Sequence, residues 1–263
     1  MRLKEQSKGA TIAHLRIWAL ACVIVGVAGV CILLRGILGV DTHGNTLQDA
    51  EYMMALFTNE RTRGYVVTAL ICMAVETCAV PLFCMMLVEG ALNTGDFTRY
   101  MIRVFAVALV SEVPYDFATR GVWLDLSTLN PVFGMGIALV MLYFFLRYPG
   151  NHAGALVLRS ILTVVAILWT MLPGVPSVEH GPCIVLVTAV LWTFRAKPLW
   201  RAVLCGVAGL ACCIFSPYYV AAPLGAVVLY FYRGEKGADF KWGRLVAYPA
   251  ILLLCGLVYG LLT

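Results

Sequence analysis

Charged residues are scarce in this chain. They make up only 13% of the 263 residues, whereas 62% are hydrophobic, and the mean hydropathy is +0.89. Because a soluble domain carries roughly a quarter charged residues, the polar side chains here are too few to cover a surface in water. The net charge of +5 is spread over short polar stretches, without the dense basic block that indicates a nucleic-acid-binding surface. No nucleic-acid partner is expected.

Motifs for metal binding and for nucleophilic catalysis are also lacking. The ten cysteines lie in apolar stretches, and none forms a CxxC pair or pairs with histidine at zinc spacing. They are therefore expected to be small apolar side chains, and no metal is expected. The chain has neither an HExxH motif nor a Gly-rich phosphate loop. Its four histidines, His14, His43, His152 and His180, lie in predicted loops or at segment ends, so no general base is expected inside a helix.

What the sequence does have is a series of long apolar segments. Most approach the roughly 20 residues that cross about 30 Å of hydrocarbon. They predict an all-α transmembrane bundle of about nine helices, forming a single domain over residues 1–263. The segments are Ile17–Val40, Tyr65–Leu92, Tyr100–Ala118, Thr128–Leu146, Ala155–Leu172, Gly181–Phe194, Leu199–Phe215, Tyr218–Tyr232 and Leu245–Leu262. The sixth and eighth are short, which fits tilting, a thinned bilayer or a start inside a neighbouring loop.

The basic residues predict how the bundle is oriented. With the N-terminus in the cytoplasm, fifteen of the 19 Lys and Arg residues fall on the inner side and four on the outer side, as the positive-inside rule requires. The first apolar segment is too long for a signal peptide and is expected to remain as an uncleaved anchor. The outer connection Asp41–Gly64 is expected to contain a short amphipathic helix around Leu47–Phe57, either as a lid or as a plain connector.

Several ionisable residues fall at membrane depth, where a charge is costly unless it is paired or hydrated. Glu76 lies near the middle of the second segment without an obvious partner, and is expected to be protonated or to face a wet cavity. Glu112 and Asp116 are four residues apart in the third segment, so they share one helix face. Arg35 is expected at the same outer depth and could pair with both. Each of these residues is either part of a site or a structural partner that fixes helix register.

A second group lies nearer the inner side. Glu89 is expected at the depth of Arg103 and could form a structural ion pair with it.

Asn130 and Tyr115 could add hydrogen bonds in the outer layer, where prolines inside the segments favour bends around a central cavity. The same prolines are also common in plain membrane bundles.

Six stretches of the chain form a recognisable set of motifs. They are Pro-Leu-Phe-Cys-Met-Met-Leu-Val-Glu-Gly at 81–90, Arg-Tyr-Met-Ile-Arg at 99–103, Ala-Leu-Val-Ser-Glu-Val-Pro-Tyr-Asp-Phe at 108–117, Leu-Asn-Pro-Val-Phe at 129–133, Leu-Tyr-Phe-Tyr-Arg-Gly-Glu-Lys-Gly at 229–237, and Lys-Trp at 241–242 with Ala-Tyr-Pro at 247–249. In these stretches the chain resembles the TraX family, which includes the pilin acetylases associated with conjugation. The resemblance covers most of the chain and is specific between Pro81 and Phe133.

The resemblance implies a multi-pass protein of the bacterial inner membrane, related to membrane acyltransferases. It would move an acetyl group from cytoplasmic acetyl-CoA to pilin or to another membrane-associated acceptor, with membrane lipids as further partners. The expected catalytic residues are Glu76, Glu112 and Asp116, and the expected substrate-binding residues are Arg35, Glu89, Arg103, Tyr115 and Asn130.

The chain departs from the family at positions that would handle protons. By the same resemblance, the family's Asp-His pair in the first helix falls at Gly26-Val27, and its histidine in the last helix falls near Ile251. Pro217 and Asn93-Thr94 replace further polar positions of the family. A catalytically inactive relative that binds or scaffolds membrane components is therefore the alternative. A small-solute transporter is a weaker alternative, because no inverted repeat is visible.

Overall fold

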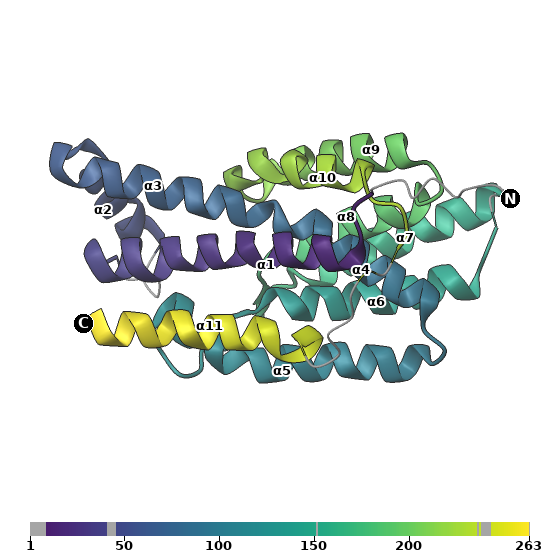
Figure 1. Ribbon diagram of the computed structural model, residues 1–263, viewed down its shortest axis with the longest axis horizontal. Helices are drawn as coiled ribbons and strands as arrows, with labels where there is room; N and C mark the ends of the chain where they lie inside the picture. Colours follow the sequence, from purple (N-terminus) through teal and green to yellow (C-terminus); the bar gives the residue numbers. More distant parts are fainter. Residues whose placement is uncertain (1–8, 41–45, 151, 236, 238–242, 263) are drawn as a thin grey trace, which may run out of the picture.

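The computed structural model describes residues 9–40, 46–150, 152–235, 237 and 243–262, and within them the protein is all-α (Figure 1). The helices are α1 (Ile12–Ala28), the π-helical η1 (Gly29–Ile37), α2 (Thr46–Thr58), α3 (Glu60–Thr77), α4 (Ala79–Asn93), α5 (Phe97–Arg120), α6 (Pro131–Arg147), α7 (Ala153–Trp169), α8 (Gly181–Thr193), α9 (Pro198–Ala211), α10 (Ala222–Tyr230) and α11 (Gly243–Leu262), with short 3-10 turns η2 (Cys212–Ile214) and η3 (Pro217–Ala221). Residues 1–8, His43, Lys236 and Lys241, which carry part of the predicted charge pattern, lie outside the described residues.

All nine predicted apolar segments are helical, which confirms the all-α prediction. The expected amphipathic helix in the first connection is also present as α2, and its Tyr52 hydroxyl donates a hydrogen bond to the carbonyl of Leu38 at 3.1 Å. The main difference is in the segment predicted over Tyr65–Leu92, which forms two helices. Pro81 explains the break, because it has no N–H to donate to the carbonyl of Thr77.

The break between α3 and α4 is stabilised by the η3–α10 region. The hydroxyl of Thr77 donates to the carbonyl of Tyr218 at 3.1 Å, and the thiol of Cys78 contacts the carbonyl of Ala221 at 3.1 Å. Gly225 of α10 lies directly against the Cys78 backbone, where any Cβ would collide with the Cys78 carbonyl. A glycine is therefore needed at this close approach.

The helices fall into two groups along the long axis of the molecule (Figure 1). In the half that holds the C-terminus, α1 with η1 packs along α3, and α11 packs along α5. In the other half, α4, α6, α8, α9 and α10 pack together. The helices α6 to α10 begin or end near the middle of the molecule (Figure 1). Much of each connection there is exposed, as at Leu172 and Val175, but Asn130 and Val178 are buried. This arrangement brings a few connection residues into the interior.

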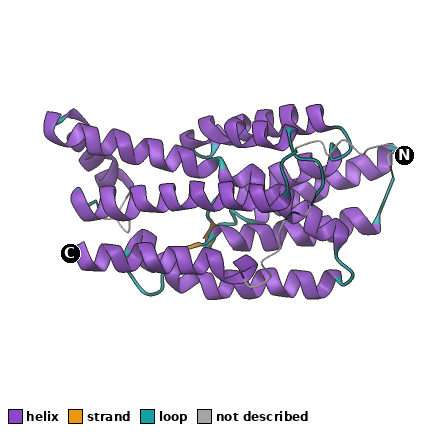
Figure 2. Cartoon of the chain, in the orientation of Figure 1, coloured by secondary structure: helices purple, strands orange, loops and turns teal. Residues whose placement is uncertain are grey.

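A parallel pair of two-residue strands joins two of these interior connections (Figure 2). The strand β1 (Thr128–Leu129) lies before α6, and β2 (Ser177–Val178) lies before α8. The amide of Glu179 donates to the carbonyl of Leu129 at 2.9 Å, which extends the pairing by one residue. The strand pair therefore fixes the α7–α8 connection against the α5–α6 connection at the centre of the molecule.

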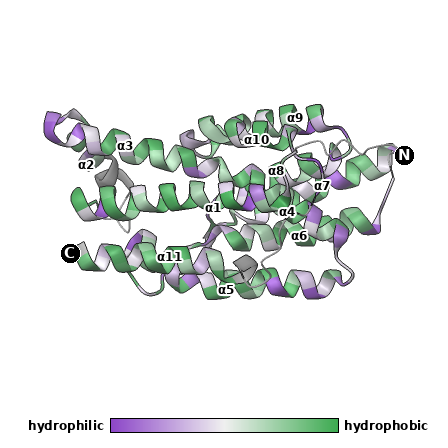
Figure 3. Cartoon of the chain, in the orientation of Figure 1, coloured by the Kyte–Doolittle hydropathy of each residue, from purple (hydrophilic) through white to green (hydrophobic). Residues whose placement is uncertain are grey.

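Burial differs strongly between the helices. Ten of the 13 residues of α8 are buried, so this helix is apolar on every side and lies at the centre of the core. In α7 only Ala155 and Ala166 are buried, although the helix is as apolar as α8. Figure 3 shows hydrophobic residues along most helices, with hydrophilic ones concentrated at helix ends and connections. All ten cysteines are free thiols, as their apolar surroundings predict.

Two helical runs are long and apolar enough to cross a membrane, namely Ile12–Ile37 with 26 residues and Glu60–Asn93 with 34 residues. The other apolar helices of the described chain have 10 to 17 residues.

Candidate functional site

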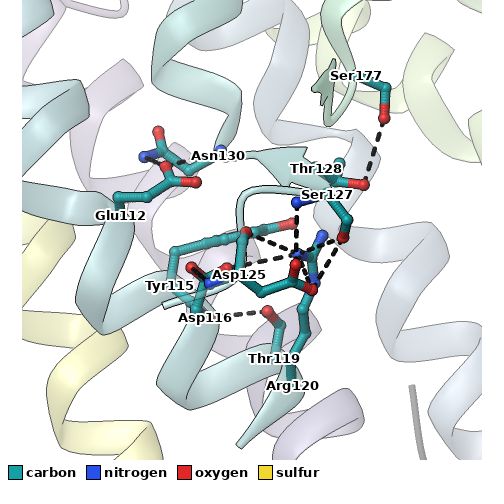
Figure 4. Close-up of polar contacts among 10 residues, drawn as sticks. All are labelled: Glu112, Tyr115, Asp116, Thr119, Arg120, Asp125, Ser127, Thr128, Asn130 and Ser177. Carbon is teal, nitrogen blue, oxygen red and sulfur yellow. Dashed lines mark hydrogen bonds and ion pairs between the residues drawn. The ribbon is translucent and has the colours of Figure 1, made fainter. Parts of the chain in front are cut away.

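The first polar cluster lies at the corner between α5 and α6 (Figure 4). Glu112 of α5 is 5% exposed and Asn130, the N-cap of α6, is fully buried. One oxygen of Glu112, Oε2, accepts hydrogen bonds from the amide nitrogen of Asn130 at 3.1 Å and from its side-chain nitrogen. Asn130 also donates to the carbonyl of Ala108 at 2.8 Å and accepts from the amide of Val132 at 2.9 Å. The predicted hydrogen bonding of Asn130 in this layer is confirmed, and its role is to start α6.

A second set of contacts at the same corner orders the α5–α6 connection. Asp116, which is fully buried, accepts a hydrogen bond from the amide of Asp125 at 2.7 Å. Arg120 lies 3.5 Å from Asp116 and 2.8 Å from Asp125. The hydroxyl of Ser127 donates to Asp125 at 2.8 Å. These contacts hold the loop against the last turn of α5 (Figure 4).

The charges at this corner stabilise one another. Hydrogen bonds from Ser127, assisted by the positive charge of Arg120, lower the pKa of Asp125 despite its partial desolvation. The ring of Tyr115 lies 6.0 Å from the guanidinium of Arg120, and Tyr115 itself is buried. Two acceptors of the corner, Glu112 Oε1 and Ser111 Oγ, have no hydrogen-bond partner among the described residues. Most polar atoms at the corner therefore have hydrogen-bond partners, whereas the Oε1 atom of Glu112 has none among the described residues.

Arg35 does not pair with Glu112 or Asp116, so that prediction is wrong. Its guanidinium donates to the carbonyls of Phe117 and Ala118, at 3.3 Å and 2.9 Å, and stacks on the ring of Tyr259 at 4.0 Å. The last carbonyls of a helix lack intrahelical donors and carry partial negative charge. Arg35 satisfies this need at the end of α5, and the sequence could not show which way its side chain points.

The second polar cluster includes residues of α1, α3 and the α7–α8 connection. Glu76, near the end of α3, is half-buried and lies directly against Gly26 of α1, leaving no room for a Cβ there. Gly26 is one of the two positions at which the resemblance implied an Asp-His pair. In this chain a carboxyl group from another helix lies against that position.

Glu179 and His180 lie in the interior beside Glu76. Both are half-buried in the connection that β1–β2 draws inward, and the charge of Glu179 acts on Glu76. His180 adopts a left-handed backbone conformation with φ 56°, and its ring meets that of Tyr219 edge-on, with 5.5 Å between centroids. Burial lowers the pKa of His180, which the nearby Glu179 carboxylate opposes. The imidazole is therefore largely neutral at pH 7 and able to accept a proton.

Tyrosines connect the two clusters. Tyr248 of α11 lies within electrostatic range of the carboxyl groups of Glu76, Glu112 and Glu179. Tyr115 of α5 lies within range of Glu76 and Glu179. Two of the three predicted catalytic residues, Glu76 and Glu112, thus lie within electrostatic range of the same tyrosine. This arrangement joins residues from α3, α5, α11 and the α7–α8 connection into one polar interior, which we call the Glu179 cluster (Glu76, Tyr115, Glu179, His180, Tyr219 and Tyr248).

Glu89 and Arg103 are not brought together. The carboxyl of Glu89 accepts a hydrogen bond from the side chain of Asn93 at 3.0 Å and lies within range of Tyr232 and Arg201. Arg103 is exposed on α5. The predicted Glu89–Arg103 pair is therefore wrong, because the rotation of α4 and α5 about their axes turns the two side chains apart.

Sequence reasoning missed Glu179 and His180 as interior residues. A signal was present, because a 13-residue apolar helix is too short to span about 30 Å of hydrocarbon and is preceded directly by two ionisable residues. Such a helix is expected to begin inside the protein, so Glu179 and His180 directly before it are expected in the interior as well. Among the described residues, no group of three or more His, Cys, Asp or Glu side chains could hold a metal ion.

These features define a class: an all-α protein of apolar helices around a polar interior that carries carboxyl groups and one neutral histidine. The chain belongs to the TraX family, since the family model described as TraX protein matches residues 43–258. No curated protein and no solved structure matches it. The family and the apolar helices together indicate a membrane protein.

Proposed function

We propose that this chain is a multi-pass protein of the bacterial inner membrane, with one membrane domain and a cytoplasmic N-terminus. The large apolar side chains that face outward support this proposal. They lie along α7, α9 and α11, and include Ile161, Val164, Leu168, Val203, Val207, Leu254 and Leu257, each at least 48% exposed. Such surfaces are rarely left open to water in a soluble monomer, whereas lipid tails cover them readily.

The distribution of basic residues supports the orientation. The chain alternates between the two ends of the bundle, so the α4–α5, α6–α7 and α8–α9 connections share one end with the start of α1 (Figure 1). The described Lys and Arg residues at or near this end are Arg16, Arg99, Arg103, Arg147, Arg159, Arg195, Lys197, Arg201 and Arg233. This asymmetry agrees with the positive-inside rule. A 17-residue helix such as α6 or α7 is about 25 Å long at 1.5 Å per residue, so local thinning of the bilayer accompanies this orientation.

The function that the geometry supports best is acyl transfer to a membrane-associated acceptor. The observation that carries it is the position of His180, which is half-buried next to Glu179 with its ring against that of Tyr219 at 5.5 Å. The acceptor's amine or hydroxyl loses a proton to His180 as it attacks the thioester carbonyl carbon. The new C–N or C–O bond forms, the C–S bond breaks, and the thiolate leaves with the proton returned by His180. Glu179 would favour the imidazolium that forms in between.

The donor in this proposal is acetyl-CoA, and the acceptor is pilin or another protein at the membrane. In this proposal the donor enters from the cytoplasm. Glu76 and Tyr248 would orient the acceptor, while Glu112, Asp116 and Asn130 would hold the α5–α6 connection that supports the interior.

Mass spectrometry of membrane peptides tests this function. Cells that express the chain are expected to contain acetylated membrane peptides that cells lacking it do not contain. The modification should disappear with His180→Ala and persist with Glu112→Gln. Identical acetylation patterns in cells with and without the chain would contradict acyl transfer.

A non-catalytic relative is the second candidate, and the corner between α5 and α6 favours it. Glu112 and Asp116, which match the family motif, accept hydrogen bonds from the backbone amides of Asn130 and Asp125. This structural role is enough to explain why both carboxyl groups are present, without a catalytic role. Purified protein in lipid nanodiscs distinguishes the two candidates. Saturable binding or hydrolysis of acetyl-CoA favours the enzyme, and the absence of both favours a binding or scaffold role.

A further inference from the structure

A cavity of about 350 Å³ lies at the end of the bundle that holds the α6–α7 connection, far from the Glu179 cluster. It is formed where α4, α6 and α8 end and α7 begins. Its lining residues are Leu92, Phe145, Leu146, Pro149, Gly150, Leu156, Arg159, Trp192, Thr193 and Arg195. We call this cavity the Arg159–Arg195 pocket. No acidic side chain is among its lining residues.

Two arginines, Arg159 and Arg195, line this pocket. Partial burial, and then the positive charge of Arg159, lower the pKa of Arg195. The guanidinium of Arg195 stacks over the ring of Trp192 at 4.3 Å, and that of Arg159 lies 5.9 Å from the ring of Phe145. In the described part of the chain, neither arginine forms an ion pair. Each arginine donates to a backbone carbonyl, Arg195 to Trp192 at 2.7 Å and Arg159 to Tyr148 at 3.5 Å. A pocket lined by two positive charges and no acidic side chain attracts an anion.

The pocket also contains donors without acceptors. Trp192 is only 3% exposed, and its indole N–H is buried without a partner among the described residues. The Nε of Arg159 is in the same situation. A buried donor left unpaired destabilises the folded protein, and native structures rarely contain several such donors close together. An anion that accepts both hydrogen bonds would remove this destabilisation at once.

We propose that the Arg159–Arg195 pocket binds a phosphate group, which accepts hydrogen bonds from Arg159, Arg195 and the indole N–H of Trp192. Phosphate suits this set because its several oxygens match the planar fork of arginine, and its charge balances two guanidinium groups. The phosphate belongs either to the headgroup of an anionic lipid or to a soluble phosphorylated ligand. This site does not rest on acyl transfer, because the 13 residues of α8 separate it from His180 by about 20 Å at 1.5 Å per residue.

Two binding measurements distinguish these sources, both with the full chain in nanodiscs. In the soluble arm, the nanodiscs contain only phosphatidylcholine, and inorganic pyrophosphate is titrated while the melting temperature and tryptophan fluorescence are followed. In the lipid arm, native mass spectrometry counts phosphatidylglycerol molecules retained from mixed nanodiscs. Arg159→Gln/Arg195→Gln is the test variant. Arg99→Gln, an exposed arginine on α5 at the same end, is the control for loss of positive charge.

The expected result is that wild type and Arg99→Gln bind alike in one of the two arms, and that Arg159→Gln/Arg195→Gln binds at least about tenfold more weakly there. That arm identifies the source of the phosphate. Trp192→Phe keeps the ring but loses the N–H, and should weaken the same binding about threefold to tenfold. Without ligand, the double variant should melt at the same temperature as wild type or higher, since it removes a like-charge contact. Equal binding by wild type and the double variant in both arms, or no binding by wild type in either, overturns the proposal.

Discussion

The α5–α6 corner and the Glu179 cluster are both polar regions inside an apolar bundle, and they differ in how their side chains are engaged. At the corner, Glu112 and Asp116 accept hydrogen bonds from the Asn130 and Asp125 backbones, and Arg120 neutralises the loop. In the Glu179 cluster, Glu76 and Glu179 lie within electrostatic range of Tyr248, and all three residues are only half-buried.

This difference separates residues that hold the fold from residues that are free to act. A carboxyl group whose oxygens already accept backbone hydrogen bonds gives up stability if it moves a proton. A half-buried carboxyl or imidazole beside others can change protonation without breaking a helix cap. Glu112 and Asp116, which match the family motif, therefore support the structure. The groups proposed to react come from a connection that the sequence analysis places outside.

Replacing His180 should give the largest effect. His180→Ala is expected to reduce acyl transfer by about 10²- to 10⁴-fold, because it removes the general base, which corresponds to about 3–5 kcal/mol in the barrier. The melting temperature in detergent should change little. Quantitative mass spectrometry of acetylated product measures the loss. In wild type, activity should persist below pH 6.5 and fall only as the pH drops through the lowered pKa of His180.

Removing the hydrogen bonds between Glu112 and Asn130 should reduce the stability of the protein more than its acyl-transfer activity. Glu112→Ala leaves the buried donors of Asn130 without an acceptor, so it is expected to lower the free energy of unfolding by about 2–4 kcal/mol. Glu112→Gln keeps an acceptor oxygen and should cost much less. Denaturant unfolding in mixed micelles measures both variants. Equal stability of Glu112→Ala and wild type would show that the corner does not hold the fold.

The contact between α1 and α3 offers a steric test of the second region. Gly26→Ala places a Cβ against the carboxyl and Cβ of Glu76, and is expected to cost about 1–3 kcal/mol, as overpacking usually does. Gly64→Ala, on the exposed side of α3 with nothing near its Cβ, is the matched control. It should stabilise the protein by up to about 1 kcal/mol through helix propensity. Thermal unfolding of the two variants in the same detergent compares them.

The smallest expected effect is a pH dependence at the corner. The folded pKa of Asp125 is depressed, so its contribution is fully present above the unfolded value of about 4. That contribution disappears as the pH falls through the lower folded value. Asp125→Asn should therefore lose less than about 1 kcal/mol at pH 7, because the carboxyl is partly exposed, and should match wild type at strongly acidic pH. A constant difference across the whole pH range would contradict this origin.

Much of the fold was predictable because apolar runs of helical length have few alternatives. All nine segments and the amphipathic helix α2 were anticipated for this reason. The break at Cys78 was less clear, since Pro81 is compatible with a bent single helix as well as with two helices. The inward course of the α7–α8 connection depends on its pairing with Thr128 and Leu129, which no local pattern reveals.

The sequence predicts at which depth of the bundle the candidate site residues lie, but not in which direction their side chains point. Glu112 and Asn130 were expected in one layer, and they are hydrogen-bonded. Arg35 and Glu89 were expected at suitable depths, but their side chains contact helix-terminal carbonyls and Asn93 instead of the predicted partners. Depth follows from position along a helix, whereas direction depends on how each helix is rotated in the bundle, and this rotation is decided by packing between distant segments.

The most direct measurement of the account compares three proteins in the same cells: wild type, His180→Ala and Glu112→Gln, each brought to equal membrane abundance. Acetylated membrane peptides are then quantified by mass spectrometry. The account predicts that wild type and Glu112→Gln produce the modification and that His180→Ala does not. Undiminished acetylation by His180→Ala, with loss in Glu112→Gln, would place the chemistry at the corner between α5 and α6 and contradict the account.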